Sequence, residues 1–171
     1  MGCERMQRVL VIGSPGAGKS TLATAIADRT GLPLVHLDRL HWRRGWIEVD
    51  RADWEPEVVR LVAGDRWVID GNYGGTLAPR LARADTAIWL DYPVWLCLWR
   101  VVRRAIRYRG RTRPDMADGC PERLNWEFFV YTARFPWAGR SRLVAALPRF
   151  AGTLVHLRRP ADAARFLGGL P

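Results

Sequence analysis

The sequence lacks any apolar run that approaches the ~20 residues needed to cross a bilayer. Glu4, Arg5 and Arg8 precede the first apolar stretch, and this is not the layout of a secretory signal peptide. We therefore expect a cytoplasmic protein that has no membrane partner.

Cysteine is also scarce. Cys3, Cys97 and Cys120 are odd in number and widely spaced. Such a set supports neither a disulfide framework nor a zinc site. We interpret all three as ordinary thiols.

Lysine is nearly absent, because Lys19 is the only lysine and every other basic side chain is arginine. A chain that uses arginine everywhere else has kept lysine at one position, which indicates a specific need there. The formal net charge of +10 favours polyanionic partners such as nucleotides, phosphorylated small molecules or nucleic acid. A solvated arginine-rich surface is the alternative explanation of that charge.

Lys19 lies in the segment GSPGAGKS at residues 13–20, which has the phosphate-loop pattern G-x-x-x-x-G-K-[ST]. An apolar strand is predicted before it (residues 9–12) and a helix after it, so a chance glycine turn is the weaker explanation. Glycines let successive N–H groups converge on phosphate oxygens, and the helix N-terminus adds its dipole. The residues expected to hold the nucleotide are Gly13, Gly16, Ala17, Gly18, Lys19, Ser20 and Thr21, with Ser20 also offering its hydroxyl to Mg²⁺.

Strand patterns alternate with helix patterns along all 171 residues. This alternation predicts one α/β domain, with a five-stranded parallel sheet and helices on both of its faces. Ligands of such sheets collect outside the carboxyl ends of the strands. The residues at four of those ends are Gly13, Asp38, Asp70 and Asp91.

A helix is predicted over about residues 94–108, followed by a mobile loop at 110–121 that contains Gly, Pro and Asp. Apolar residues at three- and four-residue steps predict the face of this helix that packs on the core. The members of this predicted core stripe are Trp95, Leu98, Val102 and Ile106, whereas Arg100, Arg103 and Arg104 are expected to be solvated.

An ordered set of segments resembles a known family: GSPGAGKST, VHLDRLHW, WVIDGNYGGTLAPRLARAD, IWLDYPVWLCLWRVVRR and GCPERL. Together they cover nearly the whole chain. They are similar to bacterial P-loop chains labelled DNA topology modulation proteins, which are adenylate-kinase-like or shikimate-kinase-like in fold. The resemblance implies a single P-loop kinase domain over residues 1–171, built as a three-layer sandwich. It also implies an acceptor-binding segment at 38–65 and a mobile lid at 109–122.

The resemblance further implies roles for individual residues, with ATP and Mg²⁺ as cofactors. Asp38 would face the acceptor hydroxyl, and Asp70 would hold Mg²⁺ together with Ser20. Capping the following turn is the alternative for Asp38, and Asp91 is a lower-ranked alternative to Asp70. The catalytic set is Lys19, Asp38, Arg111 and Arg123, with Arg107 and Arg111 on ATP and Arg158 at the adenine.

Candidate acceptor contacts lie around the second and third strand ends. Gly71-Asn72-Tyr73 replaces the nucleotide-acceptor motif of adenylate kinases, which argues against AMP as acceptor. The set is Asp38, Arg39, His41, Trp42, Asn72, Tyr73 and Arg80, with surface charge or core packing as the alternative for its basic and aromatic members. His36 alternates with apolar neighbours and is interpreted as a packing residue.

The sequence therefore predicts an ATP-dependent phosphotransferase that moves the γ-phosphoryl group to a small-molecule acceptor, either a nucleoside or nucleotide or a hydroxylated metabolite. Two alternatives stay open: a nucleotide-dependent nucleic-acid-binding regulator, and a P-loop NTPase without an acceptor. Either a monomer or a homodimer is compatible with these patterns.

Overall fold

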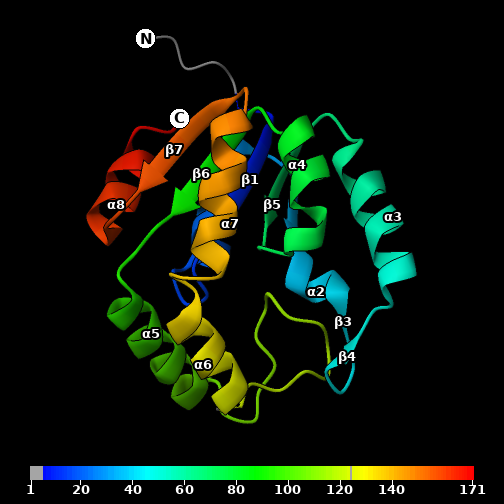
Figure 1. Ribbon diagram of the computed structural model, residues 1–171, viewed down its shortest axis with the longest axis vertical. Helices are drawn as coiled ribbons and strands as arrows, with labels where there is room; N and C mark the ends of the chain where they lie inside the picture. The colour runs from blue at the N-terminus through cyan, green and yellow to red at the C-terminus, as the bar shows by residue number, and fades with distance from the viewer. Residues whose placement is uncertain (1–5, 124) are drawn as a thin grey trace.

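The computed structural model describes residues 6–123 and 125–171. Its centre is a parallel five-stranded sheet in the order β2-β5-β1-β6-β7 (Figure 1). The strands are β1 (Arg8–Gly13), β2 (Leu34–His36), β5 (Trp67–Asp70), β6 (Thr86–Leu90) and β7 (Thr153–Leu157). The predicted five parallel strands are confirmed.

Helices cover both faces of the sheet, as the sequence predicts. One face packs against α1 (Lys19–Thr30) and α8 (Pro160–Gly168). The other packs against α3 (Arg51–Val62), α4 (Leu77–Arg83) and α7 (Gly139–Ala146). The central strand β1 is buried from Val9 to Gly13, which explains its continuous apolar sequence.

Further elements lie beyond the carboxyl ends of the strands (Figure 1). They include α5 (Val94–Arg107) and α6 (Trp126–Arg134), which lie side by side. The loop between them contains the lid segment, residues 109–122. The chain turns between α6 and α7, and Pro136, which cannot continue a helix without a break, lies in this turn. Two short 3₁₀ turns complete the fold, η1 (Gly74–Thr76) and η2 (Leu147–Arg149).

Residues 38–50, the first part of the predicted acceptor-binding segment, are mostly regular. They contain most of α2 (Leu37–His41) and an antiparallel hairpin of β3 (Trp42–Arg43) and β4 (Ile47–Glu48). The lid segment packs on this hairpin, where Met116, Ala117 and Cys120 form a small buried cluster against Trp42 and Trp46. The hairpin and the lid segment therefore form one wall beside the strand ends.

The predicted core stripe of α5 is wrong. The helix buries Cys97, Val101 and Ala105, while Trp95 and Ile106 are 68% and 72% exposed. The inward face is set by the phosphate loop, which comes so close to α5 that only small residues fit between them. No helix in the described part of the chain combines the length and apolar character that a bilayer span requires.

Candidate active site

The phosphate loop (residues 13–20) joins β1 to α1 and has the backbone that the glycines predict. Gly16 and Gly18 have φ values of 77° and 94°, in the left-handed region that side chains disfavour. A Cβ on Gly16 would also lie 2.4 Å from the carbonyl oxygen of Cys97 in α5. The loop is therefore fixed from behind by α5, and it leads directly into the N-terminus of α1.

The Lys19 ammonium folds back over this loop. Its Nζ donates to the carbonyl oxygens of Gly13, at 3.2 Å, and Ser14, at 3.1 Å. Burial lowers the pKa of Lys19, and the charges of Asp38 and Asp70 act in the opposite direction. Both carboxylates therefore lie close enough to influence the lysine.

Asp70, at the end of β5, connects the phosphate loop to β2. The Ser20 hydroxyl donates to Asp70 Oδ2 at 2.7 Å, and His36 Nδ1 lies 2.6 Å from Asp70 Oδ1. Burial would lower the pKa of His36, but the hydrogen bond and the charge of Asp70 outweigh it and raise that pKa. The interpretation of His36 as a packing residue therefore missed a direct partner of the strand-end acid. A hydroxyl beside a carboxylate is an oxygen donor pair that suits Mg²⁺.

Asp38, in α2, lies beside the turn that follows β5. The Tyr73 hydroxyl donates to Asp38 Oδ1 at 2.6 Å, and burial strongly raises the pKa of Tyr73, so the phenol keeps its proton. The preceding residue, Asn72, accepts from the Gly13 N–H at 3.1 Å and donates to the Gly13 carbonyl at 2.7 Å. The sequence analysis assigned both Asn72 and Tyr73 to acceptor binding. In the structure Asn72 is hydrogen-bonded to the phosphate loop, and Tyr73 is hydrogen-bonded to Asp38.

Aromatic rings form the floor next to Asp38. The His41 ring centre lies 4.5 Å from that of Tyr73, 4.7 Å from that of Trp54 and 5.5 Å from that of Trp42. Burial lowers the pKa of His41, which favours the neutral imidazole. His41 and Trp42 thus lie on the acceptor side, whereas Arg39 is exposed.

Arg80 is the clearest correction to the predicted acceptor residues. Its side chain is fully buried, and its guanidinium donates to the carbonyls of Gly71, Asn72, Tyr73 and Thr76. Burial lowers the pKa of Arg80. Because these donors are engaged by the turn after β5, Arg80 holds that turn and does not face a substrate.

Two arginines outside the predicted site set share one buried carboxylate. Arg104 of α5 and Arg113 of the lid segment both pair with the buried Glu122, at 3.3 Å and 2.6 Å from its Oε2. Arg113 also pairs with Asp115 at 2.8 Å. The charge of Arg104 acts to lower the pKa of Lys19, which places this arginine near the phosphate loop.

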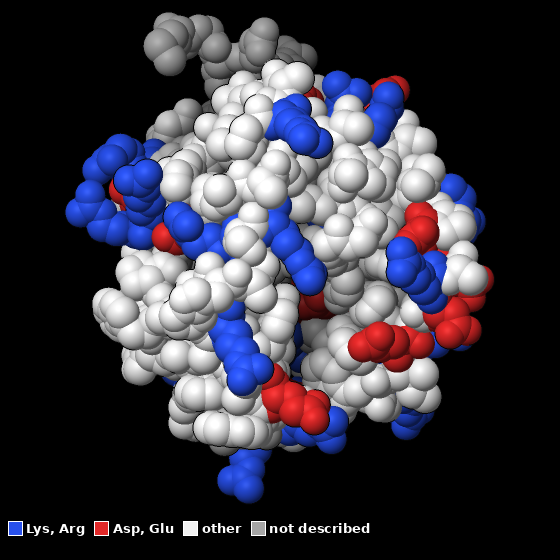
Figure 2. Space-filling model, in the orientation of Figure 1, with Lys and Arg blue, Asp and Glu red and all other residues white. Residues whose placement is uncertain are grey.

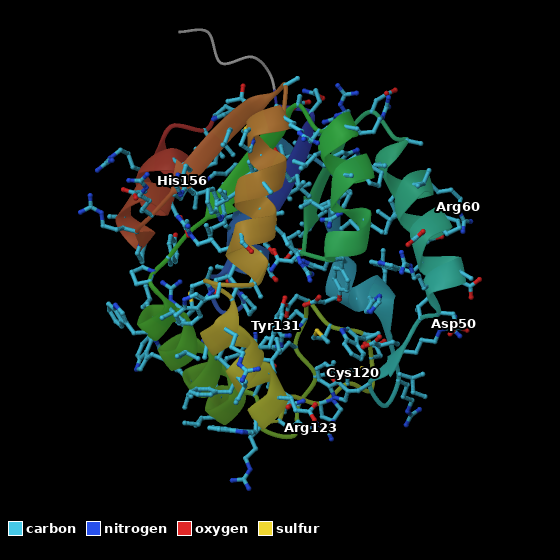
Figure 3. The ribbon with its side chains drawn as sticks, viewed as in Figure 1. Asp50, Arg60, Cys120, Arg123, Tyr131 and His156 are labelled. Carbon is cyan, nitrogen blue, oxygen red and sulfur yellow. The ribbon has the colours of Figure 1, made fainter. Side chains whose placement is uncertain are left out.

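The arginines chosen from the sequence lie at the surface. Arg107, Arg111, Arg123 and Arg158 are all exposed to solvent. Arg123 lies at the outer end of the loop, away from the strands (Figure 3). No sequence motif distinguished Arg104 and Arg113 from their neighbours, since the distinguishing feature is their shared contact with Glu122.

Asp91, the other strand-end acid, is engaged elsewhere. Both of its oxygens accept from Arg140 at 2.9 Å, and His156 Nε2 lies 3.0 Å from Oδ2. Burial would raise the pKa of Asp91, but the hydrogen bonds from Arg140 and His156 prevail and lower it. Asp91 thus ties α7 to the sheet, which leaves Asp70 as the acid beside Ser20.

Figure 2 shows a hollow near the centre of this face, with acidic atoms in its depth and basic side chains around it. Tyr131 of α6 points toward this region (Figure 3), and burial raises the pKa of its hydroxyl. The sequence patterns did not indicate this residue.

Comparisons with known proteins agree with this architecture. A family model described as "ATPase family associated with various cellular activities (AAA)" matches residues 9–55, less than half of the chain. A search of curated protein sequences finds no significant match. The matched stretch contains β1, the phosphate loop, α1 and β2.

Solved structures match almost the full length of the chain. Shikimate kinase from Acinetobacter baumannii, in complex with shikimate, aligns with a TM-score of 0.55 at 19% identity, over 96% of this chain and 92% of that one. Shikimate kinase from Bacteroides thetaiotaomicron aligns with a TM-score of 0.52 at 16% identity, over 95% of each chain. A sugar kinase from a Janibacter species aligns with a TM-score of 0.50 at 19% identity, over 95% and 93%.

At these identities the likeness concerns the fold. None of the comparisons supports the DNA topology label of the chains that the sequence motifs resemble. The chain has the α/β fold of P-loop kinases, with its phosphate loop and two strand-end carboxylates at one edge of a parallel sheet.

Proposed function

We propose that this protein is an ATP-dependent phosphotransferase that moves the γ-phosphoryl group of ATP to a hydroxyl of a small molecule. The observation that carries the proposal is the convergence on Lys19 of two carboxylates with different partners. Asp70 binds the Ser20 hydroxyl, and Asp38 binds the Tyr73 phenol. The similarity in fold to sugar and shikimate kinases supports the same reaction class.

The donor half of the reaction uses the phosphate loop. Its amides and Lys19 neutralise the β- and γ-phosphates, and phosphate oxygens take the place of the carbonyls that now accept from Lys19. Ser20 and Asp70 would hold Mg²⁺, which would neutralise part of the phosphate charge. Among the described residues, no group of three or more His, Cys, Asp or Glu could hold a metal. The other ligands would therefore be phosphate oxygens and water.

The acceptor half uses Asp38. In our proposal this carboxylate accepts the proton of the acceptor hydroxyl while that oxygen attacks the γ-phosphorus and ADP leaves. Tyr73 orients Asp38 by donating a hydrogen bond to one carboxylate oxygen, which leaves the other oxygen for the acceptor. Arg104 and Arg113 replace Arg107, Arg111 and Arg123 as the arginines proposed to stabilise the transferring phosphoryl group.

The test is an acceptor screen that follows ADP formation with Mg²⁺ and ATP. The panel contains nucleosides, nucleotides, sugars, shikimate-like acids and aminoglycosides. We expect one class to stimulate ADP formation and to yield a phosphorylated product. ATP turnover that no acceptor stimulates would instead favour an NTPase.

Two variants connect the screen to the site. Lys19→Ala should lower turnover by about 10³-fold or more while the protein stays folded. Asp38→Asn should abolish transfer to the acceptor yet keep ATP binding, because Asp38 lies on the acceptor side. Tyr73→Phe, which removes only one hydroxyl, serves as the milder control. Transfer that persists in Lys19→Ala would refute the assignment.

A further inference from the structure

The outer face of α5 carries an exposed apolar row. Trp95, Trp99, Val102 and Ile106 follow one another at steps of four, three and four residues, so they lie along one side of the helix for about 16 Å. Trp95, Trp99 and Ile106 are 68%, 54% and 72% exposed. A contiguous row of this kind on a protein surface marks an interaction site.

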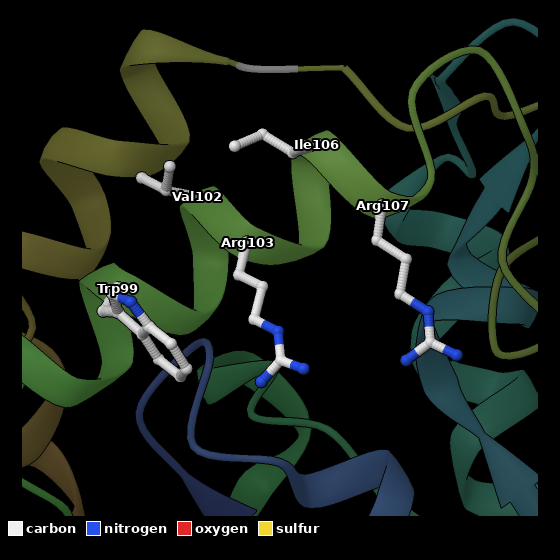
Figure 4. Close-up of a pocket in the computed structure, with 5 residues that line it drawn as sticks. All are labelled: Trp99, Val102, Arg103, Ile106 and Arg107. Carbon is white, nitrogen blue, oxygen red and sulfur yellow. The ribbon is translucent and has the colours of Figure 1, made fainter.

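Arginines lie beside this row. Arg103 and Arg107 extend side by side from α5, next to Trp99, Val102 and Ile106 (Figure 4). The Arg103 guanidinium lies 5.3 Å from the centre of the Trp99 ring. The combined surface is apolar and positively charged, and it therefore fits an anionic partner.

The charge on this face is not balanced by nearby acids of the same segment. No Asp or Glu occurs between Asp91 and Asp115. The other two arginines of the helix are turned inward, since Arg100 donates to the Ala17 carbonyl at 2.8 Å and Arg104 pairs with Glu122. Of the four arginines in α5, Arg103 and Arg107 are therefore the two that can contact a partner of opposite charge.

We propose that α5 binds the surface of an anionic lipid bilayer, with Trp95, Trp99, Val102 and Ile106 among the headgroups and upper acyl chains. Tryptophan and aliphatic residues flanked by arginine are the composition of interfacial helices. Arginine stems extend along apolar surface while their guanidinium groups contact lipid phosphates. This proposal goes beyond the phosphotransferase function and does not depend on it.

The shape and charge of the face favour this occupant over two others. All five residues that line this surface come from one helix, so no second element encloses it, and a deformable lipid surface can cover it. A second copy of the chain paired through α5 would bring the Arg103 and Arg107 charges of both copies into one interface. Single-stranded nucleic acid stacks on aromatic rings and would leave Val102 and Ile106 uncovered.

The expectation of no membrane partner rested on the absence of an apolar run long enough to span a bilayer. Surface binding needs no such run, because one exposed face of a 14-residue helix suffices. A row this short predicts reversible binding that depends on lipid charge.

The test is co-sedimentation of the full-length protein with vesicles. One set is phosphatidylcholine alone, and the other is three parts phosphatidylcholine to one part phosphatidylglycerol. We expect binding to the anionic vesicles only, and weaker binding when salt rises from about 0.1 M to about 1 M, where the Debye length falls from about 10 Å to about 3 Å. The double variant Trp95→Ser with Trp99→Ser should lower the partition coefficient about tenfold or more.

Trp137→Ser is the matched control, because Trp137 is 76% exposed but lies outside α5, between α6 and α7. It should bind vesicles like the wild-type protein, and thermal unfolding should show that all variants are folded. Ile106→Ser provides a second, independent change in the row. The proposal would be overturned if the wild-type protein did not bind anionic vesicles, or if the double variant bound them as well as the wild type does. It would also be overturned if the wild-type protein bound no vesicles but formed a dimer, or a complex with single-stranded DNA, that the double variant did not form.

Discussion

Ser20 and Asp70 are 50 residues apart in the sequence, yet the serine hydroxyl donates a 2.7 Å hydrogen bond to the aspartate. The parallel pairing of β1 with β5 brings them together, because it sets Val11 opposite Asp70 and ends both strands at the same edge. The contact holds in place the hydroxyl and the carboxylate that we assign to Mg²⁺.

The first prediction concerns this acid. Asp70→Asn removes the negative charge next to Ser20, so we expect kcat to fall by about 10²-fold or more and the Mg²⁺ concentration for half-maximal activity to rise. Steady-state kinetics over a Mg²⁺ series measures both quantities. Asp91→Asn is the matched control, since this strand-end acid pairs with Arg140 and His156. An Asp70→Asn enzyme with the wild-type Mg²⁺ requirement would contradict the metal assignment.

The second prediction concerns pH and His36. The pKa of His36 is raised in the folded protein above its ordinary value of 6.5, because the contact with Asp70 outweighs the effect of burial. The charged pair therefore contributes its full stability below pH 6.5, and the contribution disappears as the pH rises through the raised pKa. We expect His36→Gln to lower the free energy of unfolding by about 2 kcal/mol at acidic pH.

Urea denaturation of wild type and His36→Gln at about pH 6 and about pH 9 measures this difference. The gap between the two proteins should shrink at the higher pH. A gap that is equal at both pH values, or larger at the higher one, would show that the imidazole is neutral beside Asp70.

The third prediction concerns Glu122, which holds Arg104 and Arg113 together. Glu122→Gln leaves these two guanidinium groups without their shared carboxylate, and breaking a buried pair of this kind costs about 3 kcal/mol. The cost should appear locally, as faster trypsin cleavage within the lid segment and a higher KM for ATP. Glu127→Gln, at an exposed position of α6, should be cleaved like wild type.

The fourth prediction concerns Arg80. Arg80→Met leaves the carbonyls of Gly71, Asn72 and Tyr73 without their donor, so we expect a loss of about 3–5 kcal/mol in the free energy of unfolding. Urea denaturation measures it. Arg83→Met, at the exposed end of the same helix, should cost less than about 1 kcal/mol. Equal losses in the two variants would contradict the structural role of Arg80.

The donor half of the site was predictable because its signals are local. Gly16, Gly18, Lys19 and Ser20 act through backbone geometry and a fixed spacing, which the sequence displays directly. Asp70 was predictable because parallel strands end at one edge of the sheet. Neither inference required knowledge of how distant segments pack.

The face of α5 was not predictable, because hydrophobicity ranks Trp95 and Ile106 above Cys97 and Ala105. The close approach of Gly16 to Cys97 reverses that order, since a large side chain would not fit under the phosphate loop. The predicted stripe shares Trp95, Val102 and Ile106 with the exposed row, but it contains Leu98 where the row contains Trp99, and it was assigned to the core. Arg104 was missed for a similar reason, because its partner Glu122 is contributed by the loop beyond the helix.

Asn72 binds both backbone groups of Gly13, so the turn after β5 and the first residue of the phosphate loop share one hydrogen-bonded frame. In the proposed enzyme, an acceptor that moves Tyr73 would also move Asn72 and the first residue of the phosphate loop. We therefore expect acceptor and ATP to change each other's affinity, by the same coupling energy in both directions.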